Sequence, residues 1–151
     1  MTQTTEARIL KGHQGIGQRV EGVALVAQDN FSARYDLDRL KGVFSRPQHR
    51  LFGQSYVDKI LILNAAKGGV ASAWMLREMV SRNMGPKALV LNFANPIMAQ
   101  GAAYADLPML DRFEHDVTGF VETGDTVEVN PGAGMLTIIR RTLDGVDYLT
   151  R

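Results

Sequence analysis

The sequence predicts one domain of the α/β (α+β) class with a mixed β-sheet, spanning residues 1–151. Three observations predict this class: strand-like segments come first, a strand–helix–strand–helix unit fills the middle, and a hairpin ends the chain. A length of 151 residues is typical of a single domain, and the 45% of apolar residues suffices for a sizeable core.

The composition excludes several classes of function. Because there is no cysteine, disulfides, thiol catalysis and a thiolate-held metal or iron–sulfur cluster within this chain are excluded. The three histidines lie far apart in the sequence and form no local metal-ligand pattern. A net charge of +1 with thinly spread basic residues argues against nucleic-acid binding. No membrane-length apolar run or signal-peptide core is present, so a cytoplasmic protein without membrane contact is expected.

The first half of the chain is expected to form strands. Residues 6–12 and 18–28 carry closely spaced apolar side chains. The glycines around them superficially match a dinucleotide-binding fingerprint, but a strand rather than a helix follows, so turns and bulges explain them better. Residues 30–55 are polar and weakly periodic, and loops of this length are often functional. Residues 57–64 form a continuous apolar run, typical of a strand buried on both faces.

The helix that follows this apolar run is the best-defined element. Apolar side chains recur at helical spacing from Ala73 to Val80, and Ser72 is expected to cap an early turn. The pair Gly85–Pro86 marks a stop, after which residues 88–93 form a second buried strand.

The last third of the chain is expected to hold a second helix and then more strands. A short helix starts at Pro96 and is closed by Gly101, with a further strand after it. From Asp116 the pattern predicts strand, turn and strand, in which the β-rich segments 126–129 and 135–139 pair.

The loop between the first buried strand and the main helix is the candidate anion site. A small-residue loop that feeds a helix directs several backbone N–H groups to one point, where the helix dipole adds partial positive charge. Lys67 adds a full charge, and Gly68 and Gly69 allow the backbone to approach a ligand closely. The Walker A spacing is absent. The alternative is a tight turn with an exposed lysine.

Residues 42–53 fit the pattern Gly-x-x-x-Asp-x-x-His-x-Leu-x-Gly at the first glycine and at His49, Leu51 and Gly53. With this stretch, nearly the whole chain resembles the small subunit, or swivel domain, of the aconitase X family in the aconitase superfamily. Phe31 and Asp38 are kept from a Phe-Trp-Gly-Gly-x-Asp-like segment. The order and spacing of the motifs together carry the resemblance, and the matching segments are residues 20–26, 31–38, 42–55, 58–79, 85–110 and 123–138.

The resemblance implies a swivelling β/β/α fold, aconitase swivel-like, which docks on a large aconitase X-like subunit as a heterodimer. In the family that partner holds the cysteine ligands of an iron–sulfur cluster, and the active site lies between the two subunits. No cofactor is then expected on this chain. The implied function is the small subunit of a hydro-lyase, inactive alone, that dehydrates a small hydroxylated acid such as cis-3-hydroxyproline or a phosphorylated mevalonate.

The sequence departs from the family at the catalytic loop, which is usually Arg-Gly-Ser-x-Ser-Gly-Ser with the first serine thought to abstract the proton. Aligned without a gap, Lys67 falls on the arginine and Gly69 on that serine, and glycine cannot act as a base. Ser72 is the only nearby hydroxyl. Three alternatives stay open: Ser72 is the base, the partner supplies it, or the chain is a divergent form, even a non-catalytic binding or regulatory module on a swivel scaffold.

The candidate site residues follow from the loop and the resemblance. Lys67, Gly68, Gly69 and His49 are expected to bind substrate, and Ser72 is the catalytic candidate. His49 has the alternative of a loop histidine hydrogen-bonded for structure, and Ser72 that of a helix cap. No metal ligand is expected. Further candidates are Arg34 and Arg46 for a substrate acid group, and Trp74 and Phe52 for a docking surface.

Overall fold

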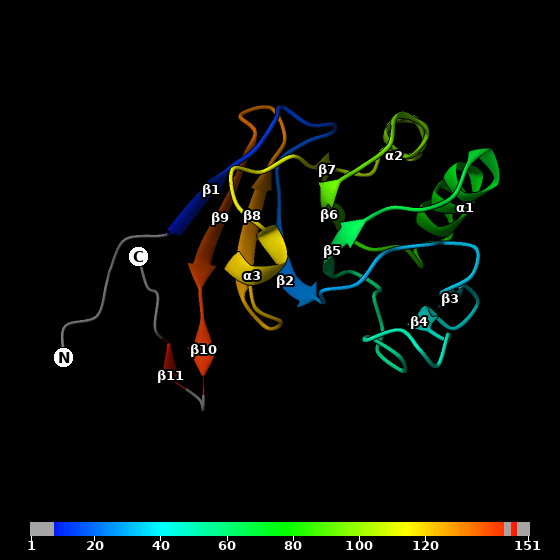
Figure 1. Cartoon of the computed structure of the whole chain (residues 1–151), viewed down its shortest axis with the longest axis horizontal. Helices are drawn as coiled ribbons and strands as arrows, with labels where there is room; N and C mark the ends of the chain where they lie inside the picture. Colours follow the sequence, from blue (N-terminus) through cyan, green and yellow to red (C-terminus); the bar gives the residue numbers. More distant parts are fainter. Residues whose placement is uncertain (1–7, 144–145, 148–151) are drawn as a thin grey trace.

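The computed structural model describes residues 8–143 and 146–147 and is organised around a mixed seven-stranded sheet (Figure 1). This confirms the predicted fold class. The strands of the sheet, in spatial order, are β1 (Arg8–Lys11), β9 (Met135–Arg140), β8 (Thr126–Asn130), β2 (Val20–Val26), β5 (Ile60–Ala65), β6 (Ala88–Phe93) and β7 (Met109–Leu110). The other elements are α1 (Val70–Ser81), α2 (Pro96–Ala105), α3 (Val117–Phe120) and the short strands β3 (Leu37–Asp38), β4 (Val43–Phe44), β10 (Thr142–Leu143) and β11 (Val146–Asp147).

Strand β2 joins an antiparallel half of the sheet to a parallel half. Its first residues pair antiparallel with β8, with Val20 opposite Val129. Its last residues pair parallel with β5, with Ala24 opposite Ile60. The predicted pairing of β8 with β9 is also confirmed. The sheet is therefore mixed because one strand serves both halves.

Two hydrophobic cores lie on opposite faces of the parallel strands. Leu61 and Leu63 of β5 pack with residues of α1 and α2, whereas Ile60 and Ile62 pack with α3 and the antiparallel strands. Alternate side chains of a strand point to opposite faces, so a continuous apolar run fits a strand covered on both. Strand β5 starts at Ile60 rather than at position 57, because Asp58 adopts a left-handed conformation with φ 58°.

Two details of the helices differ from the expectations. Gly101 does not close α2 but lies buried in its middle, where a Cβ atom would stand 2.6 Å from the Cβ of Ala73 in α1. The helix ends instead at Asp106, whose φ is 59°. The strand expected just after Asp116 is the one-turn helix α3, because the Asp116 carboxylate accepts hydrogen bonds from the N–H and hydroxyl of Thr118.

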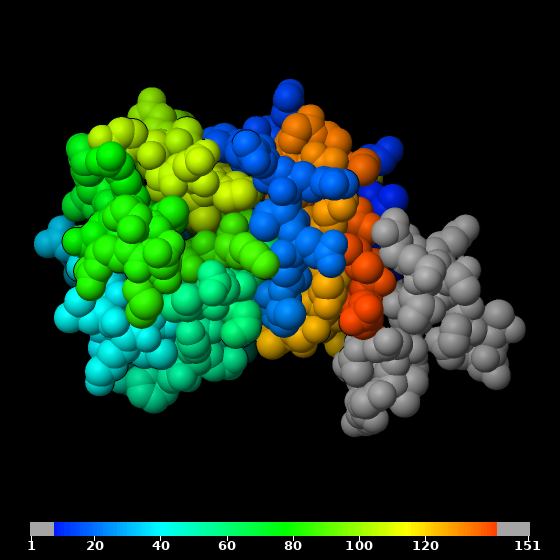
Figure 2. Space-filling view, turned by 180° about the vertical axis from the view of Figure 1, so that it is seen from behind, coloured from blue at the N-terminus to red at the C-terminus, as the bar shows by residue number. Residues whose placement is uncertain are grey.

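The long polar region between β2 and β5 folds onto the rest of the molecule through its few large apolar side chains. Phe31, Phe44, Leu51 and Tyr56 are buried in the core beneath α1 and α2. Figure 2 shows this region, in cyan and teal, continuous with the green and yellow-green surface of the two helices. The region is therefore an ordered wall beside the loop that precedes α1.

Candidate functional site

The loop Lys67–Gly69 leaves the carboxyl end of β5 and enters α1. Two backbone hydrogen bonds to Phe31 anchor it: the Phe31 N–H donates to Ala65 at 2.8 Å, and the Lys67 N–H donates to Phe31 at 2.7 Å. The carboxyl ends of parallel strands are the usual place for ligands in such sheets. The loop is therefore held rigidly at the edge where a ligand is expected.

The two glycines of the loop have different roles. Gly68 has φ +113°, and a Cβ there would meet the Ser72 hydroxyl oxygen at 2.3 Å, so no other residue fits. Gly69 is the N-cap of α1, is exposed, and has open space around an added Cβ. Position 69 would therefore accept a serine without strain.

The N-terminus of α1 is a set of free donors. No side chain makes a capping hydrogen bond there. Among the described residues, the N–H groups of Gly68 and Gly69 also find no acceptor. These N–H groups, the helix dipole and the exposed Lys67 together favour an anion at this point.

A cavity of about 350 Å³ opens beside this loop. It brings Lys67 and Gly68 together with Arg46, which sequence reasoning had left among the secondary candidates. The lining residues are Asp29, Asn30, Phe31, Ser32, Tyr35, Asp36, Arg46, Lys67 and Gly68.

Asp36 is the buried carboxylate that organises this wall of the cavity. Its Oδ2 accepts from the Ser32 N–H at 2.9 Å, and its Oδ1 accepts from Arg46 Nε at 2.5 Å. The hydrogen bond that Arg46 donates to Asp36 raises the pKa of the Arg46 guanidinium, which therefore stays charged. Asp38, the aspartate that the resemblance singled out, instead caps a turn by accepting from the N–H groups of Leu40 and Lys41.

Asp29 also lines the cavity, and each of its oxygens accepts a hydrogen bond. Its two oxygens accept from the backbone N–H groups of Asn30 at 2.7 Å and Arg50 at 3.1 Å. Burial acts to raise the pKa of Asp29, but these hydrogen bonds, with the charge of Arg46 nearby, leave that pKa below its usual value. Asp29 is therefore an ionised acceptor that is already used by the protein.

His49 lies behind the cavity wall rather than in it. His49 is 3% exposed, and its ring stacks on the Phe44 ring with a centroid distance of 4.5 Å. Its Nδ1 accepts from the Leu51 N–H, so Nε2 carries the proton and donates it to the Asn30 carbonyl at 2.7 Å. Both ring nitrogens are engaged, and His49 is placed to hold Asn30 rather than a ligand.

Ser72 lies in the first turn of α1, three residues after the N-cap, and is 2% exposed. It is therefore not the cap that the sequence suggested. Its hydroxyl makes no hydrogen bond to the part of the chain that the structure describes, and Ser72 is not among the residues that line the cavity. Of the predicted residues, Lys67 and Gly68 meet in the cavity, Gly69 borders it, and His49 and Ser72 do not line it.

A polar network that sequence reasoning missed continues along the same edge of the sheet. The Asn92 amide, at the end of β6, donates to Asn64 of β5 and to Asp116, and Asn64 donates to Asn30. Hydrogen bonds from Thr118 and Asn92 lower the pKa of Asp116. The available signal was an asparagine near the end of each buried strand.

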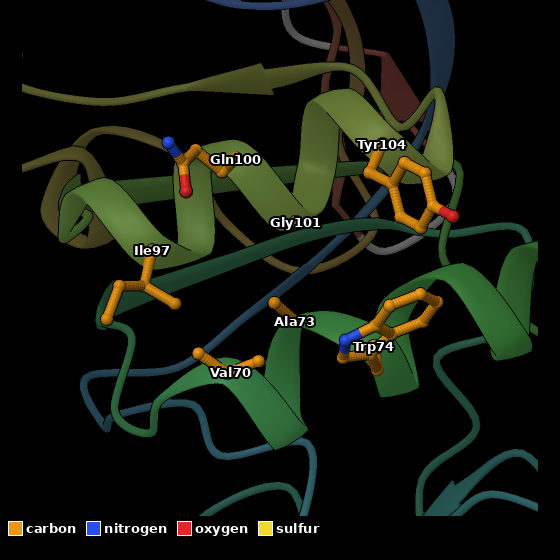
Figure 3. A pocket seen from close by; sticks show the side chains of 7 residues that line it. All are labelled: Val70, Ala73, Trp74, Ile97, Gln100, Gly101 and Tyr104. Carbon is orange, nitrogen blue, oxygen red and sulfur yellow. The ribbon is translucent and has the colours of Figure 1, made fainter.

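An apolar groove of about 390 Å³ runs between α1 and α2 (Figure 3). Trp74 is 55% exposed and meets Tyr104 edge to face at 5.1 Å. Val70, the first residue of α1, lines the groove and directly follows Gly69, so one end of the groove lies next to the loop. The groove is lined by Val70, Ala73, Trp74, Ile97, Gln100, Gly101 and Tyr104.

The donor set of the chain does not suit a metal centre. The sequence contains no cysteine, and no three histidine, aspartate or glutamate side chains of the described residues come together as metal ligands. Within the same residues, no helix has the length and apolarity needed to cross a membrane.

Comparisons with known proteins agree with this architecture. Residues 9–138 match the family model of the aconitase X swivel domain. The phosphomevalonate dehydratase small subunits of Methanocella arvoryzae and Thermococcus sibiricus are 31% and 30% identical over 85% of this chain, and the matches cover 98% and 97% of those proteins. The crystal structure of Thermococcus kodakaraensis aconitase X in its holo-form matches 87% of this chain and 98% of its own, with a TM-score of 0.81 at 28% identity. A UPF0107 protein solved by solution NMR matches with a TM-score of 0.75, 27% identity and coverage of 87% and 99%.

Proposed function

This chain belongs to the aconitase X swivel-domain family and is a dehydratase small subunit, which works with a large subunit. We propose that it completes the active site of an enzyme that dehydrates mevalonate 5-phosphate or a close analogue. The large subunit carries the iron–sulfur cluster. The curated relatives bear the name phosphomevalonate dehydratase small subunit, which supports this choice of substrate. The family's other type of substrate, a hydroxylated amino acid without phosphate, fits the free donors of this loop less well.

The observation that carries the proposal is the anion site at the start of α1. Lys67 and the free N–H groups of Gly68 and Gly69 lie in the loop at the carboxyl end of β5, which supports an anion site there. A phosphate has several acceptor oxygens and two negative charges, which match this set of donors. The role of this chain is then to hold the phosphate and orient the rest of the substrate toward the partner.

The chemical groups for elimination are divided between the subunits. Removal of water needs a base for the carbon-bound proton and a Lewis acid for the leaving hydroxyl. The Lewis acid must come from the partner, because the sequence contains no cysteine for the cluster and the described residues gather no metal ligands. Ser72 remains the hydroxyl of this chain that lies near the family's serine position, but its burial against Gly68 favours a base from the large subunit.

The groove between α1 and α2 is our proposed contact for the large subunit. It presents exposed Trp74 and Tyr104, and one end of it lies next to the Lys67 loop, so a subunit that closes over the loop also covers the groove. Trp74→Ala should weaken assembly, whereas Leu40→Ala, which removes an even more exposed apolar side chain outside the groove, should not. Gel filtration of co-expressed subunits at micromolar concentration measures this.

The test of the function is reconstitution. We expect the small chain alone to carry no stoichiometric iron and to show no activity, and the iron-loaded complex to dehydrate mevalonate 5-phosphate. Metal analysis and product detection by mass spectrometry provide the two measurements. An assembled, iron-loaded complex that converts no phosphorylated or unphosphorylated hydroxy acid would instead support the alternative, a non-catalytic binding module, for which the glycine at position 69 is the motive.

A further inference from the structure

Arg46 is a second cation in the cavity beside Lys67. The two residues come from different segments, Arg46 from the turn after β4 and Lys67 from the loop after β5. In the family stretch that position 42 leads, the fourth residue after the glycine is aspartate, and here that place is Arg46. At this position the chain therefore carries a cation where the family pattern has an acidic residue.

The arginine is fixed in place from behind. The Asp36 side chain is 5% exposed, and its Oδ1 accepts from Arg46 Nε. The two terminal guanidinium nitrogens donate to no acceptor among the described residues, and 37% of the Arg46 side chain is exposed. A guanidinium held through Nε presents its other two nitrogens as a pair of parallel donors, which is the geometry that binds a carboxylate with two hydrogen bonds.

The carboxylates of the cavity leave the two terminal nitrogens of Arg46 without a hydrogen-bond partner among the described residues, although Asp36 pairs with Nε. Asp36 is engaged by Ser32 and Arg46, and Asp29 is engaged by the N–H groups of Asn30 and Arg50. The unused hydrogen-bonding capacity of the wall is therefore on the cationic side, at Arg46 and at the Lys67 loop. A ligand with an acid group at each end could use both sets of donors.

We infer that Arg46, positioned by Asp36, determines specificity by binding the substrate carboxylate while Lys67 and the loop bind its phosphate. This rests on the proposed function and deepens it: the substrate class is a small hydroxy acid with a carboxylate at one end and a phosphate at the other. Arg46 selects for the carboxylate, and Lys67 selects for the phosphate.

The experiment compares three ligands on the assembled, iron-loaded complex. KM is measured for mevalonate 5-phosphate, and inhibition constants are measured for mevalonate, which lacks the phosphate, and for 3-methylbutyl phosphate, which lacks the carboxylate. In Arg46→Gln, the KM and the mevalonate constant should rise about 10- to 100-fold, as for loss of hydrogen bonds to a charged group, while the 3-methylbutyl phosphate constant stays unchanged. Lys67→Gln should show the opposite pattern for the two inhibitors.

Two further variants separate binding from folding. Arg46→Lys keeps a charge beside Asp36 but loses the paired donors, so its KM should lie between those of wild type and Arg46→Gln. Arg50→Gln is the control, because its side chain is exposed in the same segment and outside the cavity. Melting temperatures of all variants show whether each is folded.

The possible results distinguish the two ideas. The role of Arg46 is overturned, and the proposed function is kept, if the wild-type complex is active but the folded Arg46→Lys and Arg46→Gln variants leave the inhibition constant of mevalonate unchanged. The same holds if these variants weaken binding of 3-methylbutyl phosphate as much as binding of mevalonate. A wild-type complex that is assembled and iron-loaded but neither converts nor binds mevalonate 5-phosphate overturns the proposed function, and this inference with it.

Discussion

Gly68 approaches Ser72 so closely that a Cβ atom on Gly68 would stand 2.3 Å from the Ser72 hydroxyl oxygen. This contact joins the loop at the end of β5 to the first turn of α1. It also explains why the two adjacent glycines of the loop differ in tolerance, since a Cβ on Gly69 would have no neighbour within 4 Å.

Gly68→Ala should disrupt the anion site, whereas Gly69→Ala should be tolerated. The first change adds both the clash with Ser72 and a left-handed backbone that alanine rarely adopts. We expect KM of the complex to rise at least tenfold for Gly68→Ala and to change less than threefold for Gly69→Ala, an effect of about 1.4 kcal/mol or more against less than about 0.7 kcal/mol. Equal effects of the two variants would show that the loop does not act as described.

Gly69→Ser tests whether the family's serine can be restored. The added side chain has open space at the N-cap of α1, so the variant should fold with a stability within a few tenths of a kcal/mol of wild type. If the chain is a divergent form of the family's dehydratase small subunit, turnover of mevalonate 5-phosphate by the complex should increase. Unchanged turnover would place the base in the partner.

Ser72→Ala separates a catalytic serine from a supporting one. A base would lose roughly 10²–10⁴-fold in turnover with little change in melting temperature. Because Ser72 is buried against Gly68, we expect the supporting role, with turnover within tenfold of wild type. Steady-state kinetics and thermal melting of the same complex decide between the roles, and a loss of a hundredfold or more would restore Ser72 as the base.

Lys67→Ala should weaken binding of the phosphorylated substrate by about 1.5–3 kcal/mol, the range for hydrogen bonds to a charged group. The side chain is exposed, so the melting temperature should not change. Lys41→Ala removes another exposed lysine, distant from the cavity lining, and serves as the control. A KM that stays the same in Lys67→Ala would remove this residue from the site.

Gly101→Ala should lower the free energy of unfolding by about 1–3 kcal/mol, because the new methyl group has no room between α2 and Ala73 of α1. Gly119→Ala is the matched control, since a Cβ in α3 would meet nothing within 4 Å. That variant should be neutral or slightly more stable, as alanine favours a helix over glycine. Urea unfolding of the isolated small chain measures both.

Tyr56→Phe should stabilise the protein by about 1 kcal/mol, because the buried Tyr56 hydroxyl has no hydrogen-bond partner among the described residues. Burial also raises the pKa of Tyr56 to about 12. The unfolded chain ionises near 10, so wild-type stability should fall as the pH rises from about 10 to 12, and the phenylalanine variant should lack that loss. Tyr104→Phe, on an exposed side chain, should change neither quantity.

Some parts of this molecule follow directly from local sequence, and others do not. The apolar runs of β5 and β6 and the small residues after β5 identified the buried strands and the Lys67 loop. The place of Gly101 was wrongly predicted because a glycine often ends a helix, and only the neighbour across the helix interface shows that it serves close packing. The helix α3 was missed because a single turn carries no periodicity, although Asp116 was an available cap.

The cavity wall was the least predictable part of the site. Residues 30–55 have few regular elements, so nothing in their spacing indicates that Asp36 holds Arg46 or that His49 turns inward. These contacts depend on how Phe31, Phe44 and Tyr56 pack beneath α1 and α2, which is decided by the whole core. A family resemblance identified the important segment but not which of its aspartates is buried.

Strand β2, which is shared by the two halves of the sheet, also affects the order in which the chain folds. Val20 is paired with Val129, and Arg8 with Ile138, so the antiparallel half joins the two ends of the sequence. During synthesis on the ribosome, β2, β5 and β6 can associate early, but β1 and the first half of β2 have no partner until β8 and β9 emerge. Such distant pairings make folding slow, because a large loop must close before they form. Of the seven strands of this sheet, the two that are translated last, β8 and β9, are therefore the ones that complete it.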